Sequence, residues 1–179
     1  AGRMIVWGDD EHREYGGAVI IAADHASPIA INFMMRNGCG IVCLALEKSM
    51  CDRLQLFPQA GANVDPQTTP FTQTIDARTG ITTGTSAFDR ARTVAAAIDP
   101  RSGPDDLVRG YGHVNGLRAR DGGVLVRAGH TEGSVDLARL AGLTPAAVIC
   151  EIVRPDGHMA HLPELREFCR HHGLKMCTI

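Results

Sequence analysis

The stretch Val124-Leu125-Val126-Arg127-Ala128-Gly129-His130-Thr131-Glu132 contains the pattern from which we infer the fold. It predicts a short apolar strand, a turn, and a helix that begins at Ser134. Arg127 carries a planar fork of donors suited to phosphate, and His130 can ligate a metal or transfer a proton near neutral pH. Thr131 adds a hydroxyl at a helix start, where anions are favoured. The stretch therefore predicts either a site for a phosphorylated small molecule, with or without a metal, or an ordinary strand–turn–helix junction.

The same alternation of apolar strands with helical patterns extends outward along the chain. Strands are predicted at residues 4–7, 18–23, 41–45, 71–76, 124–126, 146–152 and 174–179. Helices are predicted at residues 29–36 with Ser27 as the cap, 47–54, 87–98, 134–141 and 163–172. Residues 56–70 and 110–116 are predicted to be loops. No repeat or linker divides the pattern, so the prediction is one α/β domain over residues 1–179.

Composition and charge exclude several classes of protein. The 179 residues carry 18 basic and 20 acidic side chains without a dense basic run, which argues against nucleic acid as a partner. No apolar run is long enough to cross a membrane, and the first residues do not resemble a signal peptide. The six cysteines form no CxxC pair, so we expect free, mostly buried thiols and a reducing, cytoplasmic location.

An acidic loop near the start of the chain is a candidate cation site. Asp9, Asp10, Glu11 and Glu14 place four carboxylates within six positions. Magnesium is usually held by one or two carboxylates together with waters and substrate oxygens. The alternative is a solvated surface loop, which is the commoner outcome for such clusters. Arg13 beside Glu14 adds a cation that could face the same ligand.

Further candidates each have a structural and a functional interpretation. Glu151 is a single carboxylate in an apolar strand, where an unpaired charge is costly, so we favour a site at the strand end. Cys43 is either a core thiol or a reactive one. His113 lies among glycines and is either a surface histidine or a functional one. The hydroxyl-rich residues 82–86 either bind phosphate or sugar hydroxyls, or cap the helix that follows.

Three motifs in fixed order make the pattern specific. They are Asp-Asp-Glu-x-Arg-Glu at 9–14, Thr-Thr-Gly-x-Ser-Ala-x-Asp-Arg at 82–90, and Gly-Gly-Val-Leu-x-Arg-Ala-Gly-His-Thr-Glu at 122–132. Together they resemble the 3,4-dihydroxy-2-butanone 4-phosphate synthase family, and the likeness runs in unbroken order from about residue 2 to residue 179. The usual N-terminal helix of that family is not expected in this chain.

The resemblance implies a function and a set of site residues. The family converts ribulose 5-phosphate into the four-carbon precursor of riboflavin and formate, with magnesium (or manganese), in an α/β fold with a mixed β-sheet packed with helices. It implies a homodimer with active sites at the subunit interface. By position, the implied metal ligands are Glu14 and His130, and the implied catalytic residues are Glu14, Glu151, Cys43 and His113, the last supplied across the dimer. The implied substrate and phosphate contacts are Arg13, Arg127, Ala128, Gly129, His130, Thr131 and Glu151.

The chain departs from the family pattern mainly at one loop. Where the family continues Asn-Glu-Gly-Asp, this chain has Tyr15-Gly16-Gly17-Ala18, so two carboxylates are missing, one of which contacts substrate in the family. An extra residue also precedes His113. Three hypotheses follow: the family reaction, a related lyase or isomerase acting on another sugar phosphate or related acid, and a catalytically silent domain that binds a ligand or supports a fused enzyme. The retained Glu14, His130, Arg127 and Glu151 favour the first two, and the missing carboxylate at Ala18 weakens the first. Of the three, the family reaction is the one that we predict.

Overall fold

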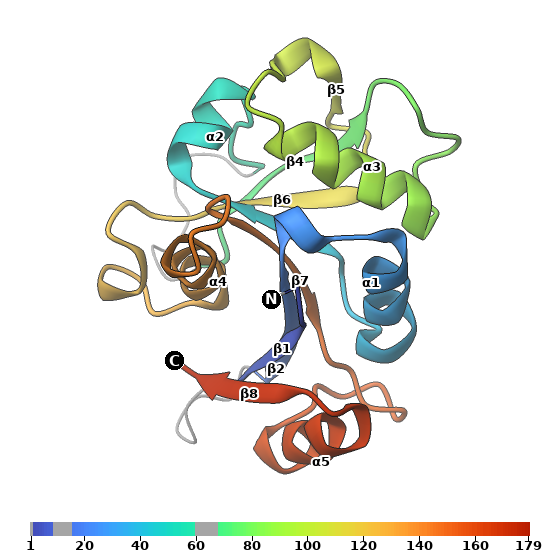
Figure 1. The fold of residues 1–179 in the computed structure, drawn as a ribbon, viewed down its shortest axis with the longest axis vertical. Coiled ribbons are helices and arrows are strands. Elements are labelled where there is room, and N and C mark those ends of the chain that lie inside the picture. Colours follow the sequence, from blue (N-terminus) through green and yellow to red (C-terminus); the bar gives the residue numbers. More distant parts are fainter. Residues whose placement is uncertain (1, 9–15, 60–67) are drawn as a thin grey trace.

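A mixed β-sheet organises the computed structural model, which describes residues 2–8, 16–59 and 68–179 (Figure 1). The strands within these ranges are β1 Ile5–Gly8, β2 Gly17–Ala22, β3 Cys43–Leu46, β4 Phe71–Ala77, β5 Leu107–Arg109, β6 Val114–Arg118, β7 Ala146–Glu151 and β8 Lys175–Thr178. Their order across the sheet is β5-β4-β6-β3-β7-β2-β1-β8. The pairs β1–β8 and β3–β6 are parallel and the other pairs antiparallel, which confirms the predicted mixed α/β architecture.

Helices cover both faces of this sheet. The α-helices are α1 Pro28–Phe33, α2 Lys48–Arg53, α3 Ala87–Ile98, α4 His130–Leu140 and α5 Leu162–His172. Helix α1 continues into a π-helix at Met34–Gly38, and it starts as predicted, with Ser27 Oγ accepting a hydrogen bond from Ala30 N at 3.2 Å. Helix α4 lies on one side of the sheet, and α1 and α3 lie on the other (Figure 1).

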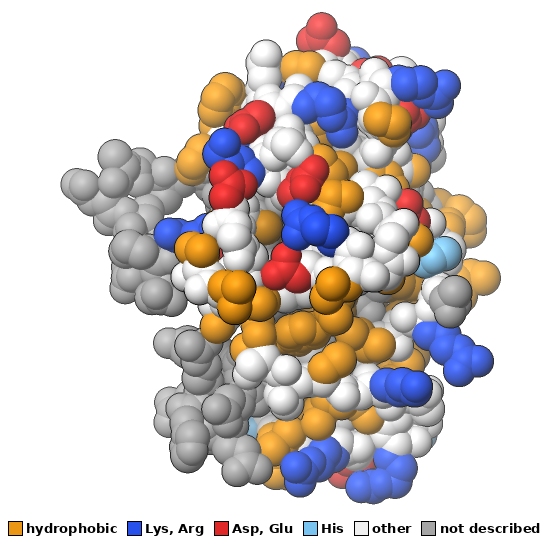
Figure 2. Space-filling view, turned by 60° about the vertical axis from the view of Figure 1, so that its left-hand side comes forward, with side chains coloured by type: hydrophobic (Ala, Val, Ile, Leu, Met, Phe, Trp, Pro, Cys, Tyr) orange, Lys and Arg blue, Asp and Glu red, His pale blue; other side chains and the backbone are white. Residues whose placement is uncertain are grey.

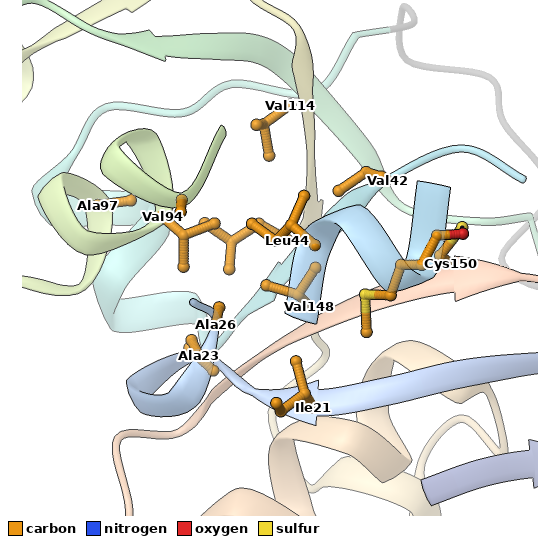
Figure 3. Close-up of a cluster of buried hydrophobic side chains, with 14 of the residues drawn as sticks. Ile21, Ala23, Ala26, Val42, Leu44, Val94, Ala97, Val114, Val148 and Cys150 are labelled. Atoms are coloured by element: carbon orange, nitrogen blue, oxygen red, sulfur yellow. The ribbon is translucent and has the colours of Figure 1, made fainter. Parts of the chain in front are cut away.

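Alternation along the strands divides the apolar core between the two faces. Figure 3 shows Leu44 of β3 and Val148 of β7 on the face that also meets Val94 of α3. The residues next to them along the strands, Cys43 and Ile149, are buried in a second cluster against α4. Successive side chains of a strand point to opposite faces, so one ladder of strands supplies both cores.

The apolar run at residues 124–126 does not form the predicted strand. Gly123–Leu125 is a 3-10 turn that follows Gly122, whose φ is 91°, and Asp136 Oδ2 accepts a hydrogen bond from Val124 N at 2.9 Å. Leu125 is 95% exposed, so this run belongs to no core. Helix α4 also begins at His130 rather than at Ser134, because the polar residues His130 and Thr131 already form its first turn.

Two strands of the structure were not predicted from the sequence. The segment predicted as the loop 110–116 includes the first half of β6, and β5 precedes it. Strand β6 has the sequence Val-Asn-Gly-Leu-Arg, which lacks an apolar run, yet it pairs with both β3 and β4. The backbone hydrogen bonds to β3 and β4 stabilise this segment as a strand, although its side chains have no strand-like apolar pattern.

Apolar side chains also gather beside α4 on its own face of the sheet. Figure 2 shows a band of hydrophobic side chains on this side of the molecule, and a groove there is lined by Ile5, Ile20, Leu137 and Leu143 among others. Separately, none of the helices in the described ranges is long and apolar enough to cross a membrane.

Candidate active site

Glu151 lies at the end of β7, where backbone groups of the segment before β3 hold it. Ile41 N donates a hydrogen bond to Glu151 Oε2 at 2.9 Å, and Gly40 N donates to the carbonyl oxygen of Glu151 at 3.1 Å. A Cβ at position 40 would lie 2.7 Å from Oε2, so only glycine allows this close approach. The carboxylate is thus half-buried, oriented by a backbone N–H, and placed at a strand end as expected.

Cys43 is a close neighbour of this carboxylate. It starts β3, pairs with Ile149 of β7, and is 2% exposed. Burial raises the pKa of the Cys43 thiol far above its usual range, and the nearby charge of Glu151 raises it further. The thiol is therefore protonated at neutral pH, and Cys43 can act there as a small neutral group but not as a thiolate.

Arg127 is fixed by a buried carboxylate that the sequence reasoning did not single out. Arg127 Nη1 and Glu132 Oε2 lie 2.6 Å apart, and their side chains are 10% and 0% exposed. Glu132 Oε1 also accepts a hydrogen bond from Arg120 N at 3.1 Å. Any Cβ at Gly129 would overlap Arg127 Nη1. The signal for Glu132 was its place in the Arg-Ala-Gly-His-Thr-Glu motif, five residues after an arginine.

The residues predicted to contact phosphate form the start of α4. Gly129 is the N-cap residue, His130 is the first helical residue, and Thr131 is 3% exposed. The first helical hydrogen bond joins Gly133 N to Gly129 O at 2.9 Å. The N–H groups of a first turn point beyond the helix, where the dipole favours an anion. Backbone N–H groups at this helix start can therefore face an anion, as the sequence predicted for Thr131.

His113 is not a lone surface histidine, because a buried aspartate holds it. Its Nδ1 lies 2.7 Å from Asp76 Oδ2, and its backbone N donates to Asp76 Oδ1 at 3.0 Å. Asp76 is 6% exposed, and a Cβ at Gly84 would lie 2.5 Å from His113 Nδ1. Arg90 donates to the carbonyl oxygen of His113. The sequence reasoning missed Asp76, whose signal is a carboxylate within the alternating strand 71–76.

The hydroxyl-rich segment 82–86 has the capping role, one of its two predicted interpretations. Asp89 Oδ1 accepts from Thr82 N at 3.0 Å, and Asp89 Oδ2 accepts from Thr82 Oγ1 at 2.7 Å and from Gly84 N at 3.0 Å. Ser86 Oγ in turn accepts from Asp89 N at 3.1 Å. The hydrogen bonds from Thr82 lower the pKa of the Asp89 carboxyl. This network fixes the start of α3 and the glycine that contacts His113.

Two of the candidate residues, Glu151 and Cys43, share one face of the sheet. Strand alternation puts Glu151 on the face of Ile149, which faces α4, and Cys43 belongs to the same cluster. His113 immediately precedes β6, where Asn115 pairs with Cys43. Within the described ranges, no three His, Cys, Asp or Glu side chains lie close enough together to hold a metal ion. The predicted acidic loop, with Asp9, Asp10, Glu11, Arg13 and Glu14, lies outside the described residues.

Comparisons with known proteins identify the family of the chain. The family model for 3,4-dihydroxy-2-butanone 4-phosphate synthase matches residues 1–179. The riboflavin biosynthesis protein RibBA of Aquifex aeolicus is 53% identical over 180 residues, which are 99% of this chain and 44% of that protein. The chain therefore spans less than half the length of this relative.

Solved structures give the same answer. RibBX from A. baumannii, a two-domain 3,4-dihydroxy-2-butanone 4-phosphate synthase, matches with a TM-score of 0.93 and 47% identity over 99% of this chain and 52% of its own. A 3,4-dihydroxy-2-butanone 4-phosphate synthase in complex with two magnesium ions matches with a TM-score of 0.92 and 39% identity, covering 99% and 87% of the two chains. The fold, the fixed Arg127 and the match of the family model along the whole chain lead to one conclusion: this chain belongs to the 3,4-dihydroxy-2-butanone 4-phosphate synthase family.

Proposed function

We propose that the chain is a lyase that converts ribulose 5-phosphate into 3,4-dihydroxy-2-butanone 4-phosphate and formate. The observation that carries the proposal is Arg127, fixed by Glu132 at the start of α4, on the sheet face where the carboxylate of Glu151 is held. A guanidinium beside a helix N-terminus suits a phosphate, and a positioned carboxylate suits proton transfer on the attached sugar. The names of the relatives, which include riboflavin biosynthesis proteins, support it.

Each candidate residue then has a role. The backbone of Ala128, Gly129, His130 and Thr131 binds phosphate together with Arg127, and Arg13 contacts the same substrate. Glu151 removes and returns protons beside the carbonyl carbon. His113, whose Nδ1 is held by Asp76, presents Nε2 for a further proton transfer. Cys43 packs beside Glu151 as a neutral thiol.

The donor types also suit a divalent cation. His130 supplies an imidazole nitrogen and Glu14 a carboxylate, a small set that leaves room for substrate oxygens, as magnesium and manganese sites often do. Such a cation would supply positive charge beside the oxygens on which negative charge develops. Magnesium in a solved family member supports this assignment. Arg127 and the start of α4 neutralise the phosphate, which leaves Glu151 to act on the sugar.

A homodimer with shared active sites is part of the proposal. Tyr111, two residues before His113, is 88% exposed, and Phe57 is 59% exposed, so a second copy could cover both and receive His113. Analytical ultracentrifugation tests the dimer. Mixing His113→Ala with Glu151→Gln chains tests the sharing, because hybrid dimers then contain one complete site and regain activity. No activity in a confirmed hybrid would contradict a shared site. The cytoplasmic location stays a prediction from the cysteine pattern.

The activity itself is tested by incubating the chain with magnesium and ribulose 5-phosphate and measuring formate. We expect formate from the wild type and at least a hundredfold loss in Glu151→Gln, Glu14→Ala and His130→Ala, on the order of general acid–base contributions. Glu167→Gln, an exposed carboxylate on α5, is the matched control and should retain full activity. Formate production that survives in Glu151→Gln would refute the role of this carboxylate.

One observation favours a related enzyme with another substrate. Ala18 is fully buried beside Glu151 on the sheet, where it adds only a methyl group. Metal-dependent turnover of a different sugar phosphate, without formate from ribulose 5-phosphate, would establish this alternative. Gly16→Glu with Ala18→Asp should then raise activity on ribulose 5-phosphate, although Gly16 has a φ of 81° that strains any side chain there. Calorimetry that detects no binding of metal or sugar phosphate would instead indicate a silent domain.

A further inference from the structure

Asp76 of β4 is a buried carboxylate that faces two nitrogen atoms of one residue. It is 6% exposed, its Oδ1 accepts from the backbone N of His113 at 3.0 Å, and its Oδ2 lies 2.7 Å from His113 Nδ1. A backbone N–H can only donate, so Oδ1 is an acceptor whatever the state of the imidazole. An ionised carboxylate has no proton to donate, so Oδ2 accepts as well and Nδ1 carries the hydrogen.

Gly84 encloses the contact between this carboxylate and the imidazole. Its φ is 95°, and a Cβ at this position would lie 2.4 Å from Asp76 Oδ2 and 2.5 Å from His113 Nδ1. Gly84 N donates to Oδ2 of Asp89 in the first turn of α3 at 3.0 Å, and Asp89 is 5% exposed. The start of α3 therefore holds a glycine against Asp76 and Nδ1, where any side chain would separate them.

Arg90 of α3 fixes the backbone of His113 and brings a positive charge near Asp76. The guanidinium donates to the carbonyl oxygen of His113, and its Nε donates to the carbonyl oxygen of Thr85 at 2.9 Å. Burial lowers the pKa of Arg90, and the nearby charge of Asp76 opposes this shift. A buried charge requires a partner, and Arg90 supplies a cation near Asp76 even when the imidazole is neutral.

The opposite side of the imidazole is accessible. The His113 side chain is 36% exposed although Nδ1 is enclosed, so the exposed part of the ring is the side that carries Nε2. When the hydrogen of a neutral imidazole is on Nδ1, Nε2 carries a lone pair and can accept a proton. In the other tautomer, Nε2 would donate a hydrogen bond instead.

We propose that Asp76 is a positioning residue that fixes His113 in the Nδ1–H tautomer, so that Nε2 removes a proton from a hydroxyl group of the bound sugar phosphate. The proposal rests on the proposed function for its substrate. In this step the O–H bond breaks, its electron pair stays on the sugar oxygen, and the proton binds the lone pair of Nε2. The imidazolium keeps its Nδ1–H on Asp76, which stays ionised and stabilises the new positive charge.

Nuclear magnetic resonance measures the tautomer without any assay of activity. In a chain labelled with ¹⁵N-histidine, long-range ¹H–¹⁵N correlation spectra at pH 8 distinguish protonated from unprotonated ring nitrogens, and His113→Gln identifies the signals of His113 by their loss. We expect a protonated Nδ1 and an unprotonated Nε2 in the wild type. A wild-type spectrum with the hydrogen on Nε2 would overturn the assignment, and this result requires no variant to fold.

Asp76→Asn should invert the tautomer. The amide oxygen of asparagine must face the backbone N–H of His113, which turns its NH₂ group toward Nδ1. Nδ1 then accepts, and the hydrogen of the imidazole moves to Nε2. We expect kcat for formate release to fall about a hundredfold or more, the contribution of a general base, with little change in KM. Asp105→Asn makes the same substitution at an exposed carboxylate and should leave the tautomer and kcat unchanged.

The outcomes separate this inference from the proposed function. A folded Asp76→Asn chain that keeps the Nδ1–H tautomer, or one that inverts it without loss of kcat, overturns the role of Asp76 and leaves the proposed function standing. If the wild type binds ribulose 5-phosphate but releases no formate, the proposed function is refuted together with the role of His113 as its base. The spectra of the wild type and of Asp76→Asn then still decide whether Asp76 fixes the tautomer.

Discussion

The carboxylate of Glu132 is fully buried, and its charge is balanced by Arg127 at 2.6 Å. Removing one member of a buried pair leaves the other charge without compensation, which costs far more than the pair contributes. We therefore expect Glu132→Gln to lower the free energy of unfolding by about 3–5 kcal/mol, measured by urea denaturation. The same variant should weaken sugar-phosphate binding, because Arg127 loses the group that orients it.

The double variant Arg127→Met with Glu132→Leu is the matched control for the stability argument. It removes both charges, so it should be more stable than Glu132→Gln alone, although it loses ligand binding. A double variant less stable than the single one would contradict a charge-based explanation. The surface pair of Lys48 and Asp52, 3.4 Å apart and well exposed, should by contrast change stability little when broken.

Asp89 gives the molecule an acid-sensitive contact at the start of α3. Hydrogen bonds from Thr82 and Gly84 lower the pKa of its carboxyl below the unfolded value of about 4. A group with a lowered folded-state pKa contributes stability above its unfolded pKa and loses it as the pH falls through the folded pKa. Thermal unfolding midpoints should therefore drop as the pH falls below the unfolded value of about 4, and Asp89→Asn should show a smaller drop.

Thr82→Val tests the cause of that pH dependence. It removes the hydroxyl that donates to Asp89 Oδ2 at 2.7 Å and leaves the backbone donors in place. The drop in stability should then begin at a higher pH than in the wild type. An acid transition that is identical in all three proteins would assign it to other carboxylates.

The contact between Trp7 of β1 and Gly133 of α4 makes glycine preferable to alanine at this helical position, which is the reverse of the usual helix propensity. Alanine in place of a helical glycine usually stabilises by about 1 kcal/mol. At Gly133 the added Cβ would lie 2.5 Å from Trp7 Cζ2, so overpacking should dominate. We expect Gly133→Ala to lower the free energy of unfolding by about 1–3 kcal/mol.

A double-mutant cycle with Trp7→Phe isolates this contact. The smaller phenyl ring leaves space for the methyl group, so Gly133→Ala should be neutral or stabilising in the Trp7→Phe background. Equal effects in both backgrounds would show that the helix, and not the indole, determines the cost. The contact also couples the strand that carries Trp7 to the helix that carries His130.

The reactivity of the cysteine thiols measures whether the core of the whole molecule is folded. All six cysteines are free, and Cys43, Cys51, Cys150 and Cys169 are buried. Burial raises the pKa of the Cys51 thiol to about 12 and that of Cys150 to about 12 as well. At pH 8, therefore, iodoacetamide should label exposed Cys39 quickly and the buried thiols only after unfolding in urea. Reductant should leave the unfolding midpoint unchanged, and a lower midpoint in reductant would reveal a disulfide.

Much of the fold and part of the site could be predicted from the sequence. Helix α3 was predicted at residues 87–98 and forms at Ala87–Ile98, because Ser86 and a clear apolar stripe determine it locally. Strand β7 and the placement of Glu151 at its end followed from a continuous apolar run. Strand β6 could not be predicted, since its residues gain their partners only from β3 and β4. The apolar residues 124–126 failed as a strand because nothing packs on Leu125.

The sequence by itself determined the α/β alternation, the family motifs and the residue types of the site, because each depends on neighbours within a few positions. Only the tertiary structure decided which side chains act as pairs. Three such pairs are recognised only by their burial and by the distance between the partners. They are Glu132 with Arg127, Asp76 with His113, and Trp7 with Gly133. The physical reason is that a charge or a donor becomes costly, and therefore informative, only once folding has removed it from water.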